Sequence, residues 1–286
     1  MTPSPRTASW LQVAPMALIL FCLVLVPLAL IITVSFMDYG FAEVIPELLW
    51  ENYLDIFTSS LTLQLYAQTF KFVAIVWAVT FLLGFTIAYY LVFHVRSGAA
   101  RAICFAACAI PFWTSGPIRM VSWVPLLGRE GLVNKALLGM GLITEPLSWL
   151  LYSEFSVIIV YINVLTLAML GPIANSMSKI DHSLIHAARD QGATEWQIIR
   201  LVIFPLIKPG IAIGSIFIIT AVMGDSFIVK QMSGGQINTA VGAITTELNA
   251  FQYPPAAAKS VVMLVIVIAL VASILRLVDI RKELAK

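Results

Sequence analysis

The run HAARDQGATEWQIIRLVIFPLIKPG at residues 186–210 is a polar interruption in an otherwise apolar chain. It lies within a stretch of about 35 residues, 175–209, which is too long to be a simple connector. Gly192 divides this stretch, because glycine tolerates the positive φ at which many helices end. The run therefore predicts two short helices joined by a tight turn.

Capping residues predict where these helices begin. Asp181 is placed to cap the first helix, because its carboxylate can accept a backbone N–H of the first turn. Thr194, followed three residues later by Gln197, matches a capping box that begins the second helix. Two prolines then punctuate the return to apolar sequence: Pro205 and Pro209.

The predicted helical hairpin carries apolar residues among its charges: Leu184, Ile185, Ala187, Ala188 and Trp196. The small side chains at 187 and 188 would let another surface approach closely. Such an element suits docking into a groove of a cytoplasmic partner. An amphipathic helix that lies on lipid headgroups is the alternative interpretation.

The composition places the rest of the chain in a membrane. Of 286 residues, 60% are hydrophobic and 11% are charged, and the mean hydropathy is +0.95. A soluble domain is roughly 45 to 50% apolar and about 25% charged. The figures exclude a disordered tail or a secreted disulfide scaffold, and the net charge of +2 is too small to imply nucleic acid as a partner.

Six apolar runs are long enough to cross a bilayer core, which takes about 20 helical residues. They are residues 13–36, 70–93, 102–127, 155–174, 211–229 and 260–278. The third is broken near Pro111 and Pro117, and the third and fifth contain Arg119 and Asp225. The first exceeds the apolar length of a cleavable signal peptide, so we expect it to be retained. The predicted fold is an all-α, polytopic membrane domain of six spans over residues 13–278.

The positions of the basic residues predict the orientation. Eleven of the 17 Lys and Arg residues fall on the side of the loop 175–209, whereas the first loop, 37–69, carries five acidic residues and no basic one. Basic residues favour the cytoplasmic side. The loop 175–209 and both tails, residues 1–12 and 279–286, are therefore predicted to be cytoplasmic, as an even number of spans also requires.

The run 186–210 resembles the cytoplasmic signature of the membrane subunits of bacterial ABC importers, which reads EAA, three residues, Gly, nine residues, Ile-x-Leu-Pro. Four residues match in register: Ala187, Ala188, Gly192 and Pro205. His186 replaces the glutamate, and Val202 and Phe204 replace the Ile and Leu. Three further segments look like the permeases for spermidine, putrescine and opine-type substrates: PFWTSGPIRMVSW at 111–123, GREGLVN at 128–134 and MGDSFIVKQMSGG at 223–235.

The resemblance implies a type I importer permease fold in the bacterial inner membrane, working by alternating access. In that family the signature loop is a coupling helix seated in a cleft of the ATPase. The expected coupling residues are His186, Ala187, Ala188, Asp190, Gly192, Ala193, Trp196 and Pro205. The implied partners are two ATPase copies, a second, similar permease subunit and a periplasmic substrate-binding protein. The ATPase uses ATP and Mg, and this chain is expected to bind no cofactor.

No enzymatic activity is predicted for the chain itself. It lacks the glycine-rich phosphate cradle G-x-x-x-x-G-K-[ST] that ATP hydrolysis requires. The run MSGGQ at 232–236 resembles the LSGGQ signature of ABC ATPases, but it falls on the predicted external side and is interpreted as a turn. Two pairs of possible ligands lack the further partners that a metal site needs: Cys104 with Cys108, and His182 with His186.

Ionisable residues inside spans are costly and mark candidate substrate paths. Arg119, Asp225 and the nearby Lys230 either neutralise one another or line a cavity. A polyamine would favour a carboxylate and aromatic faces, for which the candidates are Asp225, Trp113, Trp123 and Tyr161. An opine-like anion would favour Arg119 and Lys230. The residues leave the solute open.

Two further alternatives concern the class of protein and one external segment. An ion-coupled secondary transporter would show inverted repeats, which are not evident, and a membrane-embedded enzyme would need a reactive cluster. Residues 128–153 predict a short re-entrant or interfacial helix that either contacts a substrate-binding protein or covers the outer mouth of the bundle.

Overall fold

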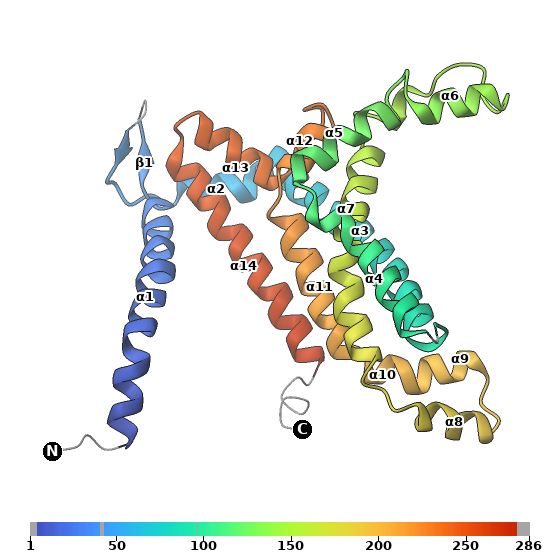
Figure 1. Ribbon diagram of the computed structural model, residues 1–286. Helices are drawn as coiled ribbons and strands as arrows, with labels where there is room; N and C mark the ends of the chain where they lie inside the picture. The colour runs from blue at the N-terminus through green and yellow to red at the C-terminus, as the bar shows by residue number, and fades with distance from the viewer. Residues whose placement is uncertain (1–4, 41–42, 96, 279–286) are drawn as a thin grey trace. The chain divides into compact units, whose positions relative to one another are not determined.

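The computed structural model describes residues 5–40, 43–95 and 97–278 (Figure 1). Most of these residues are helical, apart from two short antiparallel strands, β1 (Asp38–Tyr39) and β2 (Val44–Ile45). The predicted tail 279–286 lies outside the described residues, as do residues 1–4 of the predicted tail 1–12. The prediction of an all-α fold therefore needs one small correction, which is the pair of short strands in the first loop.

The chain divides into two compact units. The first comprises Met1–Gln64 with Ala243–Val265, and the second comprises Leu65–Gly242 with Ile266–Lys286. Three helices run from one unit into the other: α3 (Ser60–Phe93), α13 (Ala240–Asn249) and α14 (Tyr253–Leu277).

The first unit contains α1 (Pro5–Val34), the strand pair and α2 (Glu51–Thr58). From Ala14 to Val34, α1 buries none of its apolar side chains within the protein, which suits a helix surrounded by lipid. The loop that follows folds back on its end, because Asn52 Nδ2 donates to the carbonyl oxygens of Ser35 and Met37 at 3.2 and 2.9 Å.

The second unit is built around α7 (Glu154–Met177), which packs along α11 (Lys208–Met223) and also contacts α3. Near the start of α7, Glu154 Oε2 lies 2.6 Å from Nζ of Lys71 in α3. Further along both helices, Gly84 faces Met169. Since both contacts advance in the same direction, α3 and α7 are parallel.

Two glycines of α11 show that this helix runs antiparallel to α7. A Cβ at Gly210 would lie 2.5 Å from the carbonyl oxygen of Pro172, and one at Gly214 would lie 2.5 Å from Sδ of Met169. The backbones therefore approach as closely as they do because both positions lack a side chain. Met169, Leu170 and Ile173 are fully buried along this contact.

Among the described residues, four helices are long and apolar enough to cross a membrane, namely α1, α3, α7 and α14, and the count is five if the bent pair Glu195–Leu206 and Lys208–Met223 is one span. The four helices coincide with the first, second, fourth and sixth predicted spans. The third predicted span is two helices, α4 (Gly98–Trp113) and α5 (Gly116–Leu127), because Pro117 begins a new helix after the break. The fifth ends earlier than predicted, since α11 stops at Met223 and Gly224 is its C-cap.

The shorter helices gather at the two ends of the second unit (Figure 1). Where α7 ends and α11 begins lie α8 (His182–Asp190), α9 (Glu195–Ile198), the π-helix η2 (Ile199–Ile203) and α10 (Phe204–Leu206). At the other end lie α5, α6 (Leu132–Gly139), the 3-10 helix η1 (Ser148–Leu150) and α12 (Phe227–Met232). We call the end that holds α8 and α9 the hairpin end of the second unit.

Candidate functional site

The hairpin formed by α8 and α9 has the caps that the sequence predicts. Oδ1 of Asp181 accepts the backbone N–H of Ser183 at 2.9 Å, and this hydrogen bond lowers the pKa of the Asp181 carboxyl. Gly192 has φ of +81°, which places the turn where glycine is favoured. Thr194 and Gln197 form both hydrogen bonds of a capping box. These local predictions are confirmed.

The hairpin has one buried and one exposed face. Ile185 and Ile198 are buried, whereas Leu184 and Trp196 are 48% and 68% exposed. Ile185 was expected on the apolar docking surface, and that expectation is wrong because its side chain is buried. His186 and Ala187 are exposed beside Leu184, and Ala188 is half-buried. Three apolar side chains of the hairpin are therefore left exposed: Leu184, Ala187 and Trp196.

Pro205, one of the two prolines predicted to punctuate the return to apolar sequence, lies within the helical run Glu195–Leu206 and does not interrupt it. Phe204 N–H bonds to the carbonyl of Ile199, five residues earlier, so the chain passes through a π-helical turn just before the proline. A proline within an α-helix loses a hydrogen bond and clashes with the preceding turn, and the wider π turn accommodates it. The chain bends by 70° after Leu206 instead, before α11 begins at Lys208.

The candidate substrate-path residues converge at one pair. Tyr161, which is 1% exposed in α7, donates its hydroxyl proton to Oδ2 of Asp225 at 2.9 Å. The backbone N–H of Ile228 also donates to Oδ2 at 2.9 Å, which leaves Oδ1 of Asp225 without a partner among the described residues. Asp225 was expected inside the fifth span, but it lies in the turn between α11 and α12. Its carboxylate thus has a fixed orientation and one free oxygen.

The other candidates do not join this pair. Arg119 donates through Nη2 to the carbonyl oxygen of Thr114 at 2.7 Å, and its Nε is buried without a partner. Trp113 is 83% exposed, Trp123 is half-buried and Lys230 is exposed. The ion pairs within the described ranges are Lys71–Glu154, Arg189–Glu195 and Lys259–Glu247. The interpretation that Arg119, Asp225 and Lys230 neutralise one another is therefore not supported.

Several structural residues were missed from the sequence. Asn134 in α6 is fully buried and bridges residues 128 and 147 by three hydrogen bonds.

Gly210 and Gly214 form a G-x-x-x-G pattern, a known signal for close helix packing that could have found the contact between α7 and α11. The ion pair of Glu247 with Lys259 joins α13 to α14, and its side chains are only 17% and 15% exposed.

The MSGGQ run forms the turn that was predicted. Gly234 and Gly235 have φ of +61° and +78°, directly after α12. Oγ of Ser156 donates to the carbonyl of Met232 at 2.7 Å, so the turn is tied to the start of α7. Met232 and Ser233 are buried, whereas Gly234, Gly235 and Gln236 are exposed, with Gly234 next to Tyr152.

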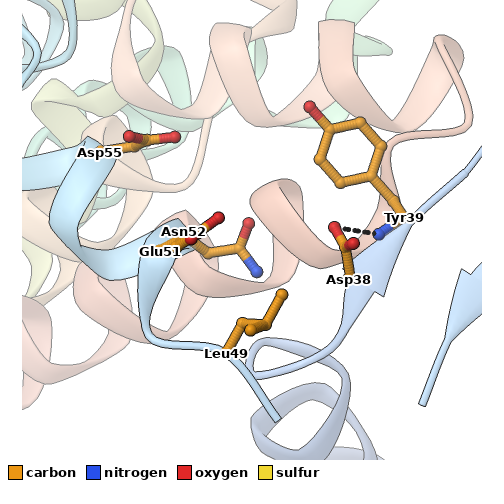
Figure 2. Close-up of a pocket in the computed structure, with 6 residues that line it drawn as sticks. All are labelled: Asp38, Tyr39, Leu49, Glu51, Asn52 and Asp55. Carbon is orange, nitrogen blue, oxygen red and sulfur yellow. Dashed lines mark hydrogen bonds between the residues drawn. The ribbon is translucent and has the colours of Figure 1, made fainter. Parts of the chain in front are cut away.

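An acidic pocket of about 340 Å³ lies in the first unit (Figure 2). Its lining residues are Asp38, Tyr39, Leu49, Glu51, Asn52 and Asp55. Oδ1 of Asp38 accepts the backbone N–H of Tyr39 at 2.8 Å, which is the dashed line in Figure 2. Across residues 5–40, 43–95 and 97–278, no three His, Cys, Asp or Glu side chains are close enough to hold a metal ion. The acidic character of the pocket follows from the lack of basic residues in the loop 37–69.

Comparisons with known proteins identify the relatives of this chain. It is 29% identical over 231 residues to the spermidine/putrescine transport system permease protein PotB of Haemophilus influenzae, covering 78% of the chain and 77% of that protein. It is 33% identical over 159 residues to PotB of Escherichia coli, of which it spans just over half, 57%. The inner membrane ABC transporter permease protein YdcU of E. coli is 28% identical over 240 residues, covering 80% and 75%. No protein-family model matches.

The fold has counterparts among solved structures. A chain of a bacterial ABC transporter that imports the acidic polysaccharide alginate superposes with a TM-score of 0.73 over 95% of this chain and 96% of that one, at 17% identity. A second structure, of an alginate ABC transporter with an alginate-bound periplasmic protein, gives 0.71 over 93% and 92%, at 16% identity. The resemblance drawn from the sequence is confirmed by the relatives that are named as ABC transporter permease proteins, and the two solved structures show that the fold is shared with a chain of an ABC transporter.

Proposed function

We propose that this chain, a homologue of ABC transporter permease proteins, is the membrane-spanning permease subunit of an ATP-driven importer for a small cationic solute of the polyamine type. The observation that carries the proposal is the hairpin of α8 and α9, whose exposed apolar face includes Leu184, Ala187 and Trp196. A helix that presents such a face fits a groove on another protein. The chain supplies no covalent chemistry, and the alternatives of a secondary transporter and an embedded enzyme gain no support from its relatives.

The position of the hairpin in the chain supports a role in transmitting motion. It follows α7 directly and leads into α11, and these two helices pack against each other through Gly210 and Gly214. A displacement of the hairpin by the ATPase would therefore move α7 and α11 together. Packed helices that shift as rigid bodies are a standard means of exchanging an inward for an outward opening.

The direction of the helices supports the six-span topology. Because α3 and α7 are parallel, the chain between them must return across the bilayer, and α4 with α5 is the segment available to do so. Since α11 is antiparallel to α7, it crosses in the opposite sense. With α1 and α14, the topology has six crossings and both termini in the cytoplasm, in the bacterial inner membrane.

The carboxylate of Asp225 supports a cationic solute. Its free Oδ1 can accept an ammonium group, while Tyr161 and the N–H of Ile228 hold Oδ2 in place. Relatives of the chain are named as spermidine/putrescine permeases, whose substrates are polyamines by that name. The aromatic residues Trp113 and Trp123 would add cation–π contacts once the helices rearrange.

The partners follow from the same proposal. Two copies of an ATPase would bind the hairpins of this chain and of a second, similar permease subunit, and a periplasmic binding protein would deliver the solute. A structural neighbour was solved with such a periplasmic protein bound. The coupling residues would be His186, Ala187, Ala188, Asp190, Gly192, Ala193, Trp196 and Pro205. ATP and Mg would be bound by the ATPase.

The test combines uptake with cross-linking in the native host. Cells that lack the gene should lose ATP-dependent uptake of labelled spermidine or putrescine and regain it with the wild-type gene. Gly192→Val should prevent this recovery while the protein still inserts, because valine is strained at φ of +81°. Gly139→Val, at another open glycine of ordinary φ, is the control. A photo-cross-linker at Trp196 should capture an ATP-hydrolysing protein; capture of lipid alone would contradict the proposal.

A further inference from the structure

A cavity of about 270 Å³ opens at the hairpin end of the second unit, away from Tyr161 and Asp225. It lies between the last turns of α3 and α7 and the first turns of α4. Its lining residues are Leu91, Val92, Arg101, Phe105, Gly171, Ala174, Asn175 and Ser178. None of the coupling or substrate-path residues belongs to this lining.

The lining is amphiphilic. Its polar groups are the Arg101 guanidinium, the Asn175 amide and the Ser178 hydroxyl, and none of its eight residues is acidic. The remaining walls are apolar, including Phe105 and the buried Leu91. A ligand that fits this surface carries an anionic, hydrogen-bonding head and an apolar tail.

Arg101 is held in place and still has capacity to bind. Its Nη2 donates to the carbonyl oxygens of Val92, in the last turn of α3, and of Val95, two residues beyond the end of that helix, at 3.1 and 3.0 Å. A guanidinium has five N–H donors, so three remain, on Nε and Nη1, without a partner among the described residues. Donors in this fork arrangement match the oxygens of a phosphate group.

We propose that this cavity binds one anionic phospholipid of the surrounding bilayer. The phosphate lies on the Arg101 guanidinium and the Asn175 amide, and an acyl chain passes along Phe105 and the open backbone at Gly171. Ser178 lines the site without donating to the phosphate, because its hydroxyl donates to the backbone carbonyl of Asn175 at 2.9 Å. The cavity sits where α3 and α7 end, which is the depth at which headgroups are found. The proposal needs only that the chain spans a membrane, so it stands or falls independently of what the chain transports.

The charge part of the site is tested by counting lipids on the purified full-length protein. Native mass spectrometry in micelles doped with equal amounts of phosphatidylglycerol and phosphatidylcholine should show retention of the anionic lipid. Arg101→Gln should reduce this retention about fivefold, the effect of one basic group near a membrane surface. Lys179→Gln removes a neighbouring positive charge that does not line the cavity, and it should leave retention unchanged.

A second variant tests the cavity without changing any charge. A Cβ at Gly171 would meet no atom within 4 Å, so there is room for a side chain to start there. Gly171→Leu directs such a side chain into the cavity that Gly171 lines and should abolish retention, with unchanged thermal unfolding as the check on the fold. Gly139→Leu, at an equally open glycine outside the cavity, is the control. This pair decides the outcome if Arg101→Gln fails to fold after losing its bonds to α3.

Three results would overturn the proposal. The first is equal retention of both lipids by the wild-type protein. The second is a preference for the anionic lipid that survives Gly171→Leu. The third is displacement of the lipid by inorganic phosphate alone, which would identify a site for a soluble anion.

Discussion

The hydroxyl of Tyr161 donates to Asp225 Oδ2 at 2.9 Å, a contact that joins α7 to the turn after α11. These residues are 64 positions apart, and the phenol is almost fully buried. Any opening between α7 and α11 during transport would have to preserve this bond or break it. The pair is therefore both a structural contact and the first candidate for the solute's charge.

Asp225→Asn should weaken uptake of a cationic solute while leaving the fold intact. The amide oxygen can still accept the bonds of Tyr161 and Ile228, but it no longer attracts an ammonium group. A hydrogen bond to a charged group contributes about 1.5 to 3 kcal/mol, so the KM for spermidine or putrescine should rise at least about tenfold. Tyr161→Phe, which keeps the charge, should raise KM less. An unchanged KM in Asp225→Asn would remove this residue from the substrate path.

Gly210→Ala should destabilise the protein more than Gly214→Ala. The added Cβ at 210 meets the Pro172 carbonyl, which cannot move aside, whereas the one at 214 meets the flexible end of Met169. Overpacking of this kind costs about 1 to 3 kcal/mol. Thermal unfolding in detergent measures the order. Gly171→Ala, where the Cβ meets nothing, is the control and should be neutral or slightly stabilising; equal effects at all three glycines would contradict close packing at 210.

The hairpin could be predicted from the sequence because each of its signals acts over a few residues. Asp181 accepts the backbone N–H two residues ahead, and Thr194 forms a capping box with Gln197 three residues ahead. Gly192 adopts its positive φ without needing a contact from elsewhere in the chain. The end of α11 could not be predicted in the same way. Apolar residues continue beyond Gly224, so hydropathy alone extends the span through Asp225 to residue 229.

Contacts between distant segments were the other limit. Nothing near Asn134 indicates that its amide will meet Leu147, and nothing near Glu247 indicates that Lys259 will face it. Pro205 shows a further limit, because no local signal in the sequence indicates the π-helical turn that precedes it, around which Ile198 and Ile203 are buried. Long-range partners set these details, whereas composition and local capping set the class of fold.

Phe251→Gly should stabilise the turn between α13 and α14. Phe251 has φ of +61°, and the N–H groups of Phe251 and Gln252 bond to the carbonyls of Leu248 and Glu247, which is a Schellman motif with phenylalanine at the usual glycine position. A non-glycine residue there costs about 1 to 2 kcal/mol. Glycine relieves this strain but also gives the unfolded chain more conformational entropy, which offsets part of the gain. The free energy of unfolding should therefore rise by about 1 kcal/mol.

The control for this change separates backbone strain from loss of the ring. Phe251→Ala removes the aromatic side chain, which is 55% exposed, but keeps the strained backbone. It should therefore be no more stable than the wild-type protein. If the alanine and glycine variants unfold at the same temperature, strain at this position does not contribute measurably.

Asn134→Ala should loosen the segment between α5 and η1. The Asn134 amide donates to the carbonyls of Gly128 and Leu147 at 3.1 Å each, and its Oδ1 accepts the N–H of Leu147 at 2.8 Å. Truncation leaves these buried backbone groups unpaired, at about 1 to 3 kcal/mol for each unsatisfied group. Hydrogen exchange across 128–147 should become faster in the variant while exchange in α7 stays the same. Lys135→Ala, at the exposed neighbour on the same helix, should leave both segments unchanged, and protection of 128–147 that survives loss of the amide would show that the apolar face of α6 holds the segment without it.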